Sequence, residues 1–368
     1  MKASADTVVV GGGVIGLSLA RELSSRGCDV VVVERGRTGD EASSAAAGLL
    51  SAQSDAESPS LFFDLARKSR DLYPEWSALL GEETGIDVGW RRIGVLRVGA
   101  AESLERFAWQ IDAGLPLERL EATEIARRSA GRAAREIHHG LFFPEDAVVD
   151  NRSLVRALES SLDHRGVAVL EGVAATRFLV ERGRCLGIET TSGPIRSDSV
   201  VDCAGAWANF DTALPFQIPV EPVRGQIVEL SDREPFPIVL ASEDVYLVPR
   251  GNGRILVGAT VERAGFRKEV TAGGVARLLA AALVLAPTLE SARVTCAWAG
   301  LRPGTPDGFP IIGESPVSGL FLAAGHFRNG ILLAPLTAVL VADMVTRVTA
   351  EHPRLFSPER FIEDARGR

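Results

Sequence analysis

Three glycines near the amino terminus have the spacing of a phosphate-binding turn. Gly11, Gly13 and Gly16 stand between an apolar, strand-like run at 7–10 and a helix-like stretch at 17–26. At this spacing the first glycine permits a tight turn, the second lets the backbone approach a pyrophosphate, and the third lets helix and strand pack closely. The N–H groups and positive partial charge at the start of the helix attract the same anion.

A carboxylate follows the glycines at the position where a ribose would lie. Glu34 comes 18 residues after Gly16, at the end of a second buried strand over 30–33. A carboxylate here accepts a hydrogen bond from an adenosine ribose hydroxyl and repels a 2′-phosphate. The strand, glycines, helix, second strand and acid together predict a βαβ unit that binds FAD or NAD rather than NADP.

Three features favour FAD over NAD. The glycine motif lies at the start of the chain, with no catalytic domain ahead of it. The run of small residues at 43–48 lets a flavin and its phosphates lie against the backbone. A second strand, 321–324, leads into a turn flanked by Gly325 and Gly330 and then into a helix. The start of that helix can stabilise negative charge on a reduced flavin.

The wider pattern predicts two interleaved domains of an α/β protein. Alternating strands and helices occur at both ends of the chain, and antiparallel strand patterns occur in the middle. We expect a Rossmann-like FAD-binding domain of 1–84, 141–215 and 291–368. We expect an α+β substrate-binding domain, built on an antiparallel sheet, of 85–140 and 216–290.

Composition excludes several classes of protein. The 368 residues are 46% hydrophobic and 24% charged, which is typical of a globular chain, and the net charge of -8 disfavours nucleic acid as a partner. Four widely spaced cysteines without a C-x-x-C pair predict neither a metal site nor a disulfide framework, and they fit the cytoplasm. The apolar run 331–342 is too short to cross a bilayer and predicts a buried helix.

Longer motifs resemble those of the FAD-dependent amine oxidoreductases of the D-amino acid oxidase family, over nearly the whole chain. The matching runs are 8–16, 42–50, 222–226, 246–250, 300–308 and 325–335. Within the family, Ser-Ser-Ala-Ala-Ala-Gly at 43–48 and Gly-His-Phe-Arg-Asn-Gly at 325–330 are most similar to the glycine-oxidising branch of thiazole biosynthesis.

The resemblance implies a bound FAD and the residues that hold it. Val173 matches a backbone contact to adenine, and 326–332 match residues around the pyrimidine side of the flavin. Related sarcosine oxidases attach the flavin to a late cysteine; because 305–310 contains none, non-covalent FAD is expected. The expected cofactor-binding residues are Gly11, Gly13, Val14, Ile15, Gly16, Glu34, Arg35, Ala42, Ser43, Ala47, Gly48, Leu49, Val173, His326, Phe327, Arg328, Asn329, Gly330, Ile331 and Leu332.

The resemblance also implies the substrate-binding residues. Arg302 matches the arginine that holds the substrate carboxylate, Tyr246 the phenol that hydrogen-bonds it, and Arg328 a second substrate-side arginine. An arginine fork binds a carboxylate through two hydrogen bonds. With the carboxylate fixed, the Cα–H faces the flavin, and hydride transfer needs positioning more than a protein base. Phe327 stands where relatives often carry Tyr, which predicts altered tuning of the flavin.

The implied activity is oxidation of glycine, and of sarcosine or small D-amino acids, to the imine and then glyoxylate, with O2 reduced to H2O2. Thiazole biosynthesis for thiamine is the implied context, and a cytoplasmic homo-oligomer, a tetramer by resemblance, without a membrane span is expected. Four alternatives stay open. They are a D-amino acid dehydrogenase that passes electrons to a quinone or carrier, a sarcosine-oxidase-like amine oxidase, a flavin domain acting on a tRNA-borne group, and a flavin subunit inactive alone.

Overall fold

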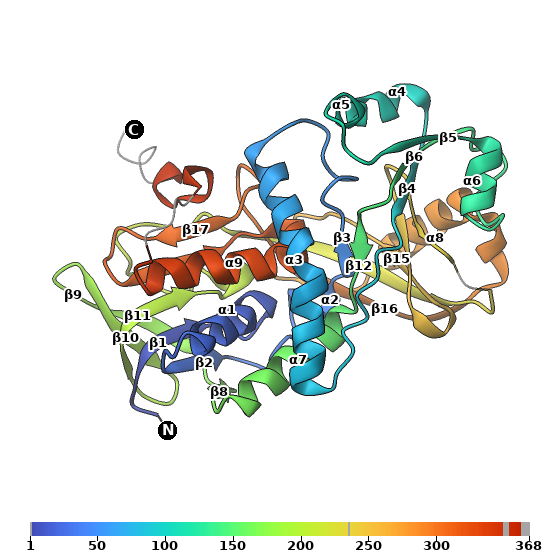
Figure 1. The fold of residues 1–368 in the computed structure, drawn as a ribbon. Helices are drawn as coiled ribbons and strands as arrows, with labels where there is room; N and C mark the ends of the chain where they lie inside the picture. The colour runs from blue at the N-terminus through green and yellow to red at the C-terminus, as the bar shows by residue number, and fades with distance from the viewer. Residues whose placement is uncertain (1, 235, 349–352, 362–368) are drawn as a thin grey trace.

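Two eight-stranded sheets, one in each half of an elongated molecule, carry most of the structure (Figure 1). The computed structural model describes residues 2–234, 236–348 and 353–361. Parts of the expected FAD-binding segment 291–368 therefore lie outside the described residues.

The first sheet contains the βαβ unit expected from the glycine motif. Its strand order is β17-β18-β11-β1-β2-β8, with β10 paired to β11 and β9 to β10. Val8 pairs with Val31 on one side and Val200 on the other, in parallel register, and is fully buried. Burial on both faces explains the valine runs of these strands. The strands are β1 (Ser4–Val10), β2 (Val30–Glu34), β8 (Ala168–Glu171), β9 (Ala175–Glu181), β10 (Arg184–Thr190), β11 (Ile195–Asp202), β17 (Ile311–Glu314) and β18 (Leu320–Ala324).

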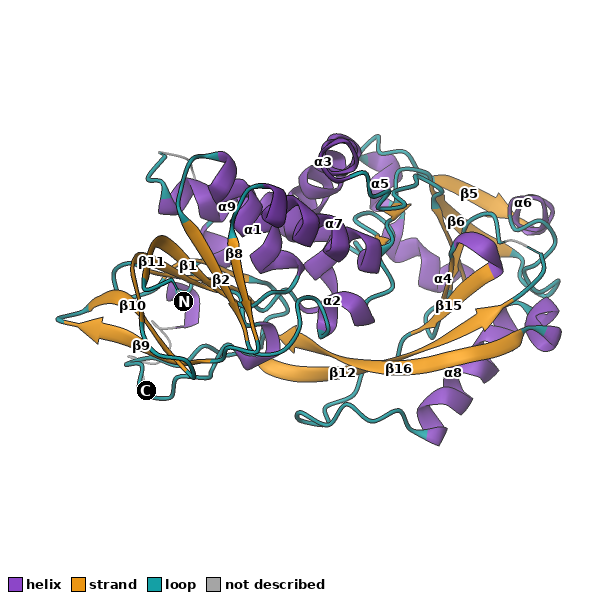
Figure 2. Ribbon diagram, turned by 90° about the horizontal axis from the view of Figure 1, so that it is seen from below, coloured by secondary structure: helices purple, strands orange, loops and turns teal. Residues whose placement is uncertain are grey.

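Helices cover one face of the first sheet (Figure 2). Leu19 and Leu158 of two helices belong to one apolar cluster with Val9 of the sheet. The opposite face buries Phe178 and Ile188 of the β9–β10 hairpin. The helices are α1 (Val14–Ser25), α3 (Leu61–Thr84), α7 (Asn151–His164) and α9 (Gly330–Val345).

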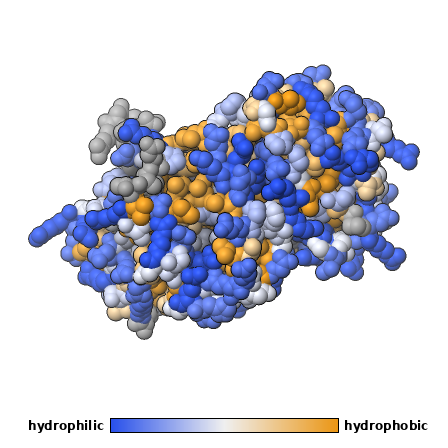
Figure 3. All heavy atoms as spheres, in the orientation of Figure 1, coloured by the Kyte–Doolittle hydropathy of each residue, from blue (hydrophilic) through white to orange (hydrophobic). Residues whose placement is uncertain are grey.

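Helix α9 is the apolar helix expected at 331–342. Among the described residues, 327–345 is the one helical stretch long and apolar enough to cross a membrane, and half of it is buried. Ala334 and Val341 are fully buried in the cluster that α9 shares with α1 and α3. Figure 3 shows apolar atoms gathered where α9 and α3 lie side by side, on an otherwise mainly hydrophilic face. The helix is therefore part of the core.

The second sheet has the order β16-β12-β15-β14-β13-β4-β6-β5 and is antiparallel except where β13 pairs with β4. Val228 lies between Ala297 and Val257 and packs with Leu278 of α8. The strands are β4 (Val95–Val98), β5 (Glu118–Glu121), β6 (His139–Phe143), β12 (Glu221–Ser231), β13 (Val239–Ala241), β14 (Tyr246–Pro249), β15 (Arg254–Gly258) and β16 (Arg293–Gly304); the helices in this half are α4 (Ala101–Leu104), α5 (Trp109–Asp112), α6 (Ala122–Arg128) and α8 (Ala272–Leu285).

The predicted fold class is confirmed: a sheet with a parallel core accompanies a largely antiparallel one. Strand pairing crosses the expected domain boundaries in two places. Strand β16 pairs with β12 along its whole length, so 293–304, expected in the FAD-binding domain, belong to the second sheet. Strand β6 crosses the expected boundary at 141 and belongs to the second sheet as well. Both differences come from long-range pairing, which local periodicity does not report. The division into two domains itself stays a prediction.

Short elements connect the two halves. Helix α2 (Ala42–Ala45) carries the first half of the small-residue run 43–48, and its Ala45 carbonyl accepts a hydrogen bond from Trp298 Nε1 of β16 at 3.0 Å. Strand β3 (Leu49–Leu50) pairs with β7 (Ala147–Val148). These contacts place the run 42–50 between the two large sheets.

Candidate active site

A cavity of about 410 Å³ extends from the glycine motif to the second sheet. Its walls come from the ends of β1 and β2 on one side and from β12, β14 and β16 on the other. This volume lies in the range of small-molecule and cofactor sites. The expected dinucleotide motif therefore lines the same cavity as Arg302 and Tyr246.

The glycine motif adopts the geometry that its spacing predicts. Gly11 has φ +110°, and a Cβ there would lie 2.4 Å from the Cys203 carbonyl oxygen. A Cβ on Gly16 would lie 2.0 Å from the Gly11 carbonyl oxygen, so close packing requires glycine. The N-cap Gly13 makes no side-chain bond to the first turn of α1, and Ser43 Oγ accepts only from the Val14 N–H, at 2.9 Å. The first turn thus retains N–H groups for a phosphate.

Glu34 is held at the cavity wall by the backbone. Its two carboxylate oxygens accept hydrogen bonds from the N–H groups of Gly12 and Gly36, both at 2.8 Å. Each oxygen keeps a further lone pair for a ligand hydroxyl. The glycine turn, the fixed carboxylate and the small residues along one cavity fit an extended dinucleotide such as FAD.

A buried arginine supports the small-residue run. Arg250 donates to the carbonyl oxygens of Ala47 at 2.5 Å and Val149 at 2.6 Å, and to Asn151 Oδ1 at 3.0 Å. Burial lowers the pKa of Arg250 to about 10, so it remains charged at neutral pH. A Cβ on Gly48 would lie 2.0 Å from the Val149 oxygen, which shows how closely these segments approach.

The far end of the cavity holds Arg302 and Tyr246. Arg302 Nη1 donates to the Thr260 carbonyl oxygen at 3.0 Å. No carboxylate of the described residues lies within 4.0 Å of its guanidinium. Burial lowers the pKa of Arg302 and raises that of Tyr246. An arginine is protonated in proteins, and a tyrosine whose pKa is raised keeps its proton at neutral pH. A partly buried cation without a counter-ion is a place for an anionic ligand.

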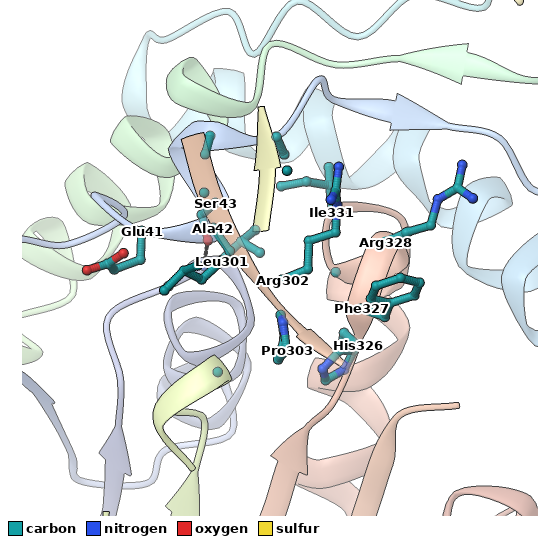
Figure 4. A pocket seen from close by; sticks show the side chains of 18 of the residues that line it. Glu41, Ala42, Ser43, Leu301, Arg302, Pro303, His326, Phe327, Arg328 and Ile331 are labelled. Atoms are coloured by element: carbon teal, nitrogen blue, oxygen red, sulfur yellow. Dashed lines mark hydrogen bonds between the residues drawn. The ribbon is translucent and has the colours of Figure 1, made fainter. Parts of the chain in front are cut away.

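The turn between β18 of the first sheet and α9 forms part of the cavity wall, through His326, Phe327 and Arg328. His326 is buried, with Nε2 3.1 Å from Thr337 Oγ1, and burial lowers its pKa to about 3. Figure 4 shows Arg302 and Arg328 extending to the same side of the cavity, above His326 and Phe327. The structure therefore brings a neutral imidazole and two guanidinium groups to one end of the site.

Most of the expected site residues line this one cavity. Those that do are Gly11, Gly13, Val14, Ile15, Glu34, Arg35, Ala42, Ser43, Ala47, Gly48, Leu49, Tyr246, Arg302, His326, Phe327, Arg328, Gly330 and Ile331. Gly16, Val173, Asn329 and Leu332 do not. The Val173 N–H donates to the Glu34 carbonyl oxygen at 3.0 Å, and Leu332 packs in the core with its carbonyl accepting from Ser69 Oγ at 2.7 Å. Contact of the expected residues with a cofactor, for those that line the cavity and for these four alike, stays a prediction.

Several cavity residues carry no signal in the local sequence. Trp207 lines the cavity, with the Arg35 guanidinium 3.5 Å from its ring centroid. Asp55 and Arg97 line its other end. A Cβ on Gly258 would lie 2.6 Å from the Tyr246 hydroxyl oxygen. The first two relations join segments far apart in the chain, and the third joins register partners of the neighbouring strands β14 and β15.

This arrangement defines a flavin-dependent oxidoreductase: a dinucleotide-binding βαβ unit opens into a cavity that ends at an uncompensated arginine. Residues 6–344 match the DAO family, described as FAD dependent oxidoreductase, and the chain belongs to this family.

Relatives and solved structures of the same family are similar over nearly the whole chain. The glycine oxidase of Geobacillus kaustophilus is 37% identical, with 93% of each chain covered, and its crystal structure has a TM-score of 0.92 over 97% of this chain and 98% of that one. The bifunctional ThiO/ThiG protein of a Nostoc species is 38% identical; 92% of this chain covers 52% of that protein, so the chain spans about half its length. The iminodiacetate oxidase of Chelativorans is 26% identical, with a TM-score of 0.87 and coverage of 96% and 98%.

Proposed function

We propose that this chain oxidises glycine. Glycine, dioxygen and water would give glyoxylate, ammonia and hydrogen peroxide, through an imine released from the site. The observation that carries the proposal is the Arg302 guanidinium beside Tyr246, which has no carboxylate within 4.0 Å among the described residues. Similarity to glycine oxidases and to a ThiO/ThiG protein supports the same substrate and the thiazole step of thiamine biosynthesis. Sarcosine and small D-amino acids present the same carboxylate and amine.

Arg302 and Tyr246 bind and orient the substrate carboxylate. The guanidinium offers a planar fork that matches both carboxylate oxygens, which fixes the direction of the Cα bond as well as its position. The Tyr246 phenol, which keeps its proton, donates a further hydrogen bond. Arg328 lies on the same side and raises the local positive potential, which favours an anionic group.

Bound FAD supplies the acceptor for the hydride of the substrate Cα and the electrons that reduce dioxygen. The glycine turn, Glu34 and the run 42–49 hold it. His326 is a weak base because its pKa is about 3, so the contribution of the chain is orientation rather than proton abstraction. We propose non-covalent attachment: Cys203 lies beside Gly11 at the phosphate end, and burial raises the pKa of its thiol well above the ordinary value.

The proposal also covers the cellular location and the oligomeric state of the protein. We place the enzyme in the cytoplasm, since its four cysteines are all unpaired, and we expect a homo-oligomer, as a tetramer, without nucleic acid as a partner.

The test is an anaerobic absorbance spectrum of the purified protein before and after addition of glycine. The expected result is an oxidised flavin band that bleaches with glycine and returns with air. Arg302→Met should keep the band and lose the bleaching. Bleaching that returns only with a quinone or dye would indicate the dehydrogenase instead. A flavin that does not respond to glycine, sarcosine or D-alanine would overturn the assignment.

A further inference from the structure

A second group of charges lines the cavity near its substrate end. Asp55 lies between two arginines: Oδ1 is 3.8 Å from Arg97 Nη1, and Oδ2 is 3.9 Å from Arg328 Nη2. Arg97 belongs to β4 of the second sheet, and Arg328 to the short η5 turn (Phe327–Asn329) beside the first. All three side chains line the cavity, so Asp55 connects two of its walls.

Hydrogen bonds to neighbouring segments hold the segment that carries Asp55 in place. The buried Asp146 carboxylate accepts from the backbone N–H groups of Gln53 at 3.1 Å and Ser54 at 2.8 Å. Arg97 Nη1 donates to the Ser54 carbonyl oxygen at 3.2 Å, and Ser51 Oγ donates to Asp55 Oδ2 at 3.0 Å. The position of Asp55 is therefore set by a buried network and not by its two ion pairs alone.

The carboxylates around this group are unevenly shared among its arginines. Arg106 has two carboxylates of its own, Glu57 at 3.4 Å and Glu243 at 2.8 Å. Arg97 and Arg328 share the single charge of Asp55. Burial lowers the pKa of Arg97, and Asp55 is the strongest charge that opposes this shift. Without Asp55, neither Arg97 nor Arg328 would have a carboxylate within 4.0 Å among the described residues.

We propose that Asp55 determines substrate specificity, by occupying Arg97 and Arg328 and so disfavouring amino acids that carry a second carboxylate. This inference rests on the proposed function of the same site. A second carboxylate must either displace Asp55 or lie within a few ångströms of a like charge, which costs binding free energy. A monocarboxylate such as glycine uses Arg302 and Tyr246, and it avoids this cost because it carries no second carboxylate. Ion pairs of 3.8–3.9 Å that are open to solvent on the Asp55 side add little stability, so the effect is on substrate choice.

The experiment compares matched substrates in Asp55→Asn and the wild type. Iminodiacetate is paired with sarcosine, and D-aspartate with D-alanine, by kcat/KM from hydrogen peroxide formation. We expect the ratio of dicarboxylate to monocarboxylate to rise at least tenfold in Asp55→Asn. Asp55→Glu should keep the wild-type ratio, and Arg97→Met added to Asp55→Asn should cancel the gain.

A matched control removes the same charge elsewhere. Asp198→Asn alters an exposed residue of β11 and should leave both ratios unchanged. Asp55→Ser removes the charge by a second route if Asp55→Asn loses FAD. Ratios that stay constant in both Asp55 variants, with activity on sarcosine and D-alanine retained, would overturn the role of Asp55 alone. A wild-type flavin that no small amino acid reduces would instead overturn the proposed function.

Discussion

A Cβ placed on Gly225 would lie 2.2 Å from Nη1 of Arg302. The two residues belong to the adjacent strands β12 and β16, in which Val223 pairs with Arg302 and Gly225 with Gly300. The Arg302 guanidinium therefore lies against the backbone of β12 at Gly225. It occupies the space that the side chain of any other residue at position 225 would need. The absence of one methyl group on β12 makes room for the guanidinium of β16 that we propose to bind the substrate carboxylate.

Gly225→Ala is expected to displace Arg302 while FAD stays bound. The new methyl group must move either the guanidinium or the strand, and a displacement of about 1 Å in a positioning group costs roughly 100-fold in rate. We expect kcat/KM for glycine to fall by about that factor, mainly through KM, with the flavin spectrum retained. Steady-state kinetics measure this change.

Gly273→Ala is the control for Gly225→Ala. It lies on α8, and its Cβ would make only an ordinary contact, 3.5 Å from Arg277 Nη1. It should leave KM unchanged. An unaltered KM in Gly225→Ala itself, with FAD bound, would show that Arg302 does not hold the substrate carboxylate.

The dinucleotide end of the cavity could be predicted because its signals are local. Gly11, Gly13 and Gly16 follow one strand directly, and Glu34 ends the next. Their roles depend on a single βαβ unit, whose hydrogen-bonding pattern is determined within about 30 residues. The predicted turn, helix start and held carboxylate therefore all occur in the structure.

The substrate end could be predicted only in part, because its relations span the chain. Arg302 and Tyr246 came from a resemblance, and the structure places both in the cavity. Gly225 stood within a matching run, but its relation to Arg302 requires the pairing of β12 with β16. Asp55 lies in a segment whose place depends on Asp146, 91 residues later. The same pairing of β12 with β16 explains why 293–304, expected in the FAD-binding domain, belong to the second sheet and not to the first.

Arg302→Lys should weaken glycine binding more than Tyr246→Phe. Lysine keeps the charge but loses the planar fork, so one point contact replaces a bidentate pair. We expect KM for glycine to rise about 100-fold in Arg302→Lys, and about tenfold in Tyr246→Phe, since one hydrogen bond from a neutral hydroxyl to a charged carboxylate contributes about 1.5 kcal/mol. Arg277→Lys on the exposed face of α8 should match the wild type. The reverse order of effects would assign the carboxylate to Tyr246 or to another group.

Arg250→Met should loosen the run of small residues and reduce FAD affinity. The substitution leaves the Ala47 and Val149 carbonyls and Asn151 Oδ1 buried without their donor. An unsatisfied buried group costs about 1–3 kcal/mol. We expect the dissociation constant for FAD to rise at least tenfold when apoprotein is titrated with FAD and followed by flavin fluorescence. Arg254→Met, a half-exposed neighbour in the same strand pair, should bind FAD normally; equal affinities for all three proteins would contradict the supporting role.

Asp202 should make stability fall as the pH rises through the acid range. It is fully buried at the end of β11, where Oδ1 accepts from the Ala204 N–H at 2.8 Å and Oδ2 has no partner among the described residues. Burial raises its pKa from 3.8 to about 7. Between these values the unfolded chain is ionised while the folded chain holds the proton, so the unfolded state binds fewer protons and stability decreases with pH.

Asp202→Asn tests this sign, because the amide keeps an acceptor for Ala204 and cannot ionise. Each pKa unit corresponds to about 1.4 kcal/mol, so the variant should gain up to about 4 kcal/mol relative to the wild type between pH 4 and pH 8. Urea unfolding at a series of pH values measures the difference between the two proteins, in which the contributions of other groups such as His326 cancel. Asp198→Asn, which removes an exposed carboxylate of the same strand, should follow the wild-type curve. Parallel curves for Asp202→Asn and the wild type would mean that Asp202 is ionised in the folded protein, and that a group near the Gly11 turn compensates its charge.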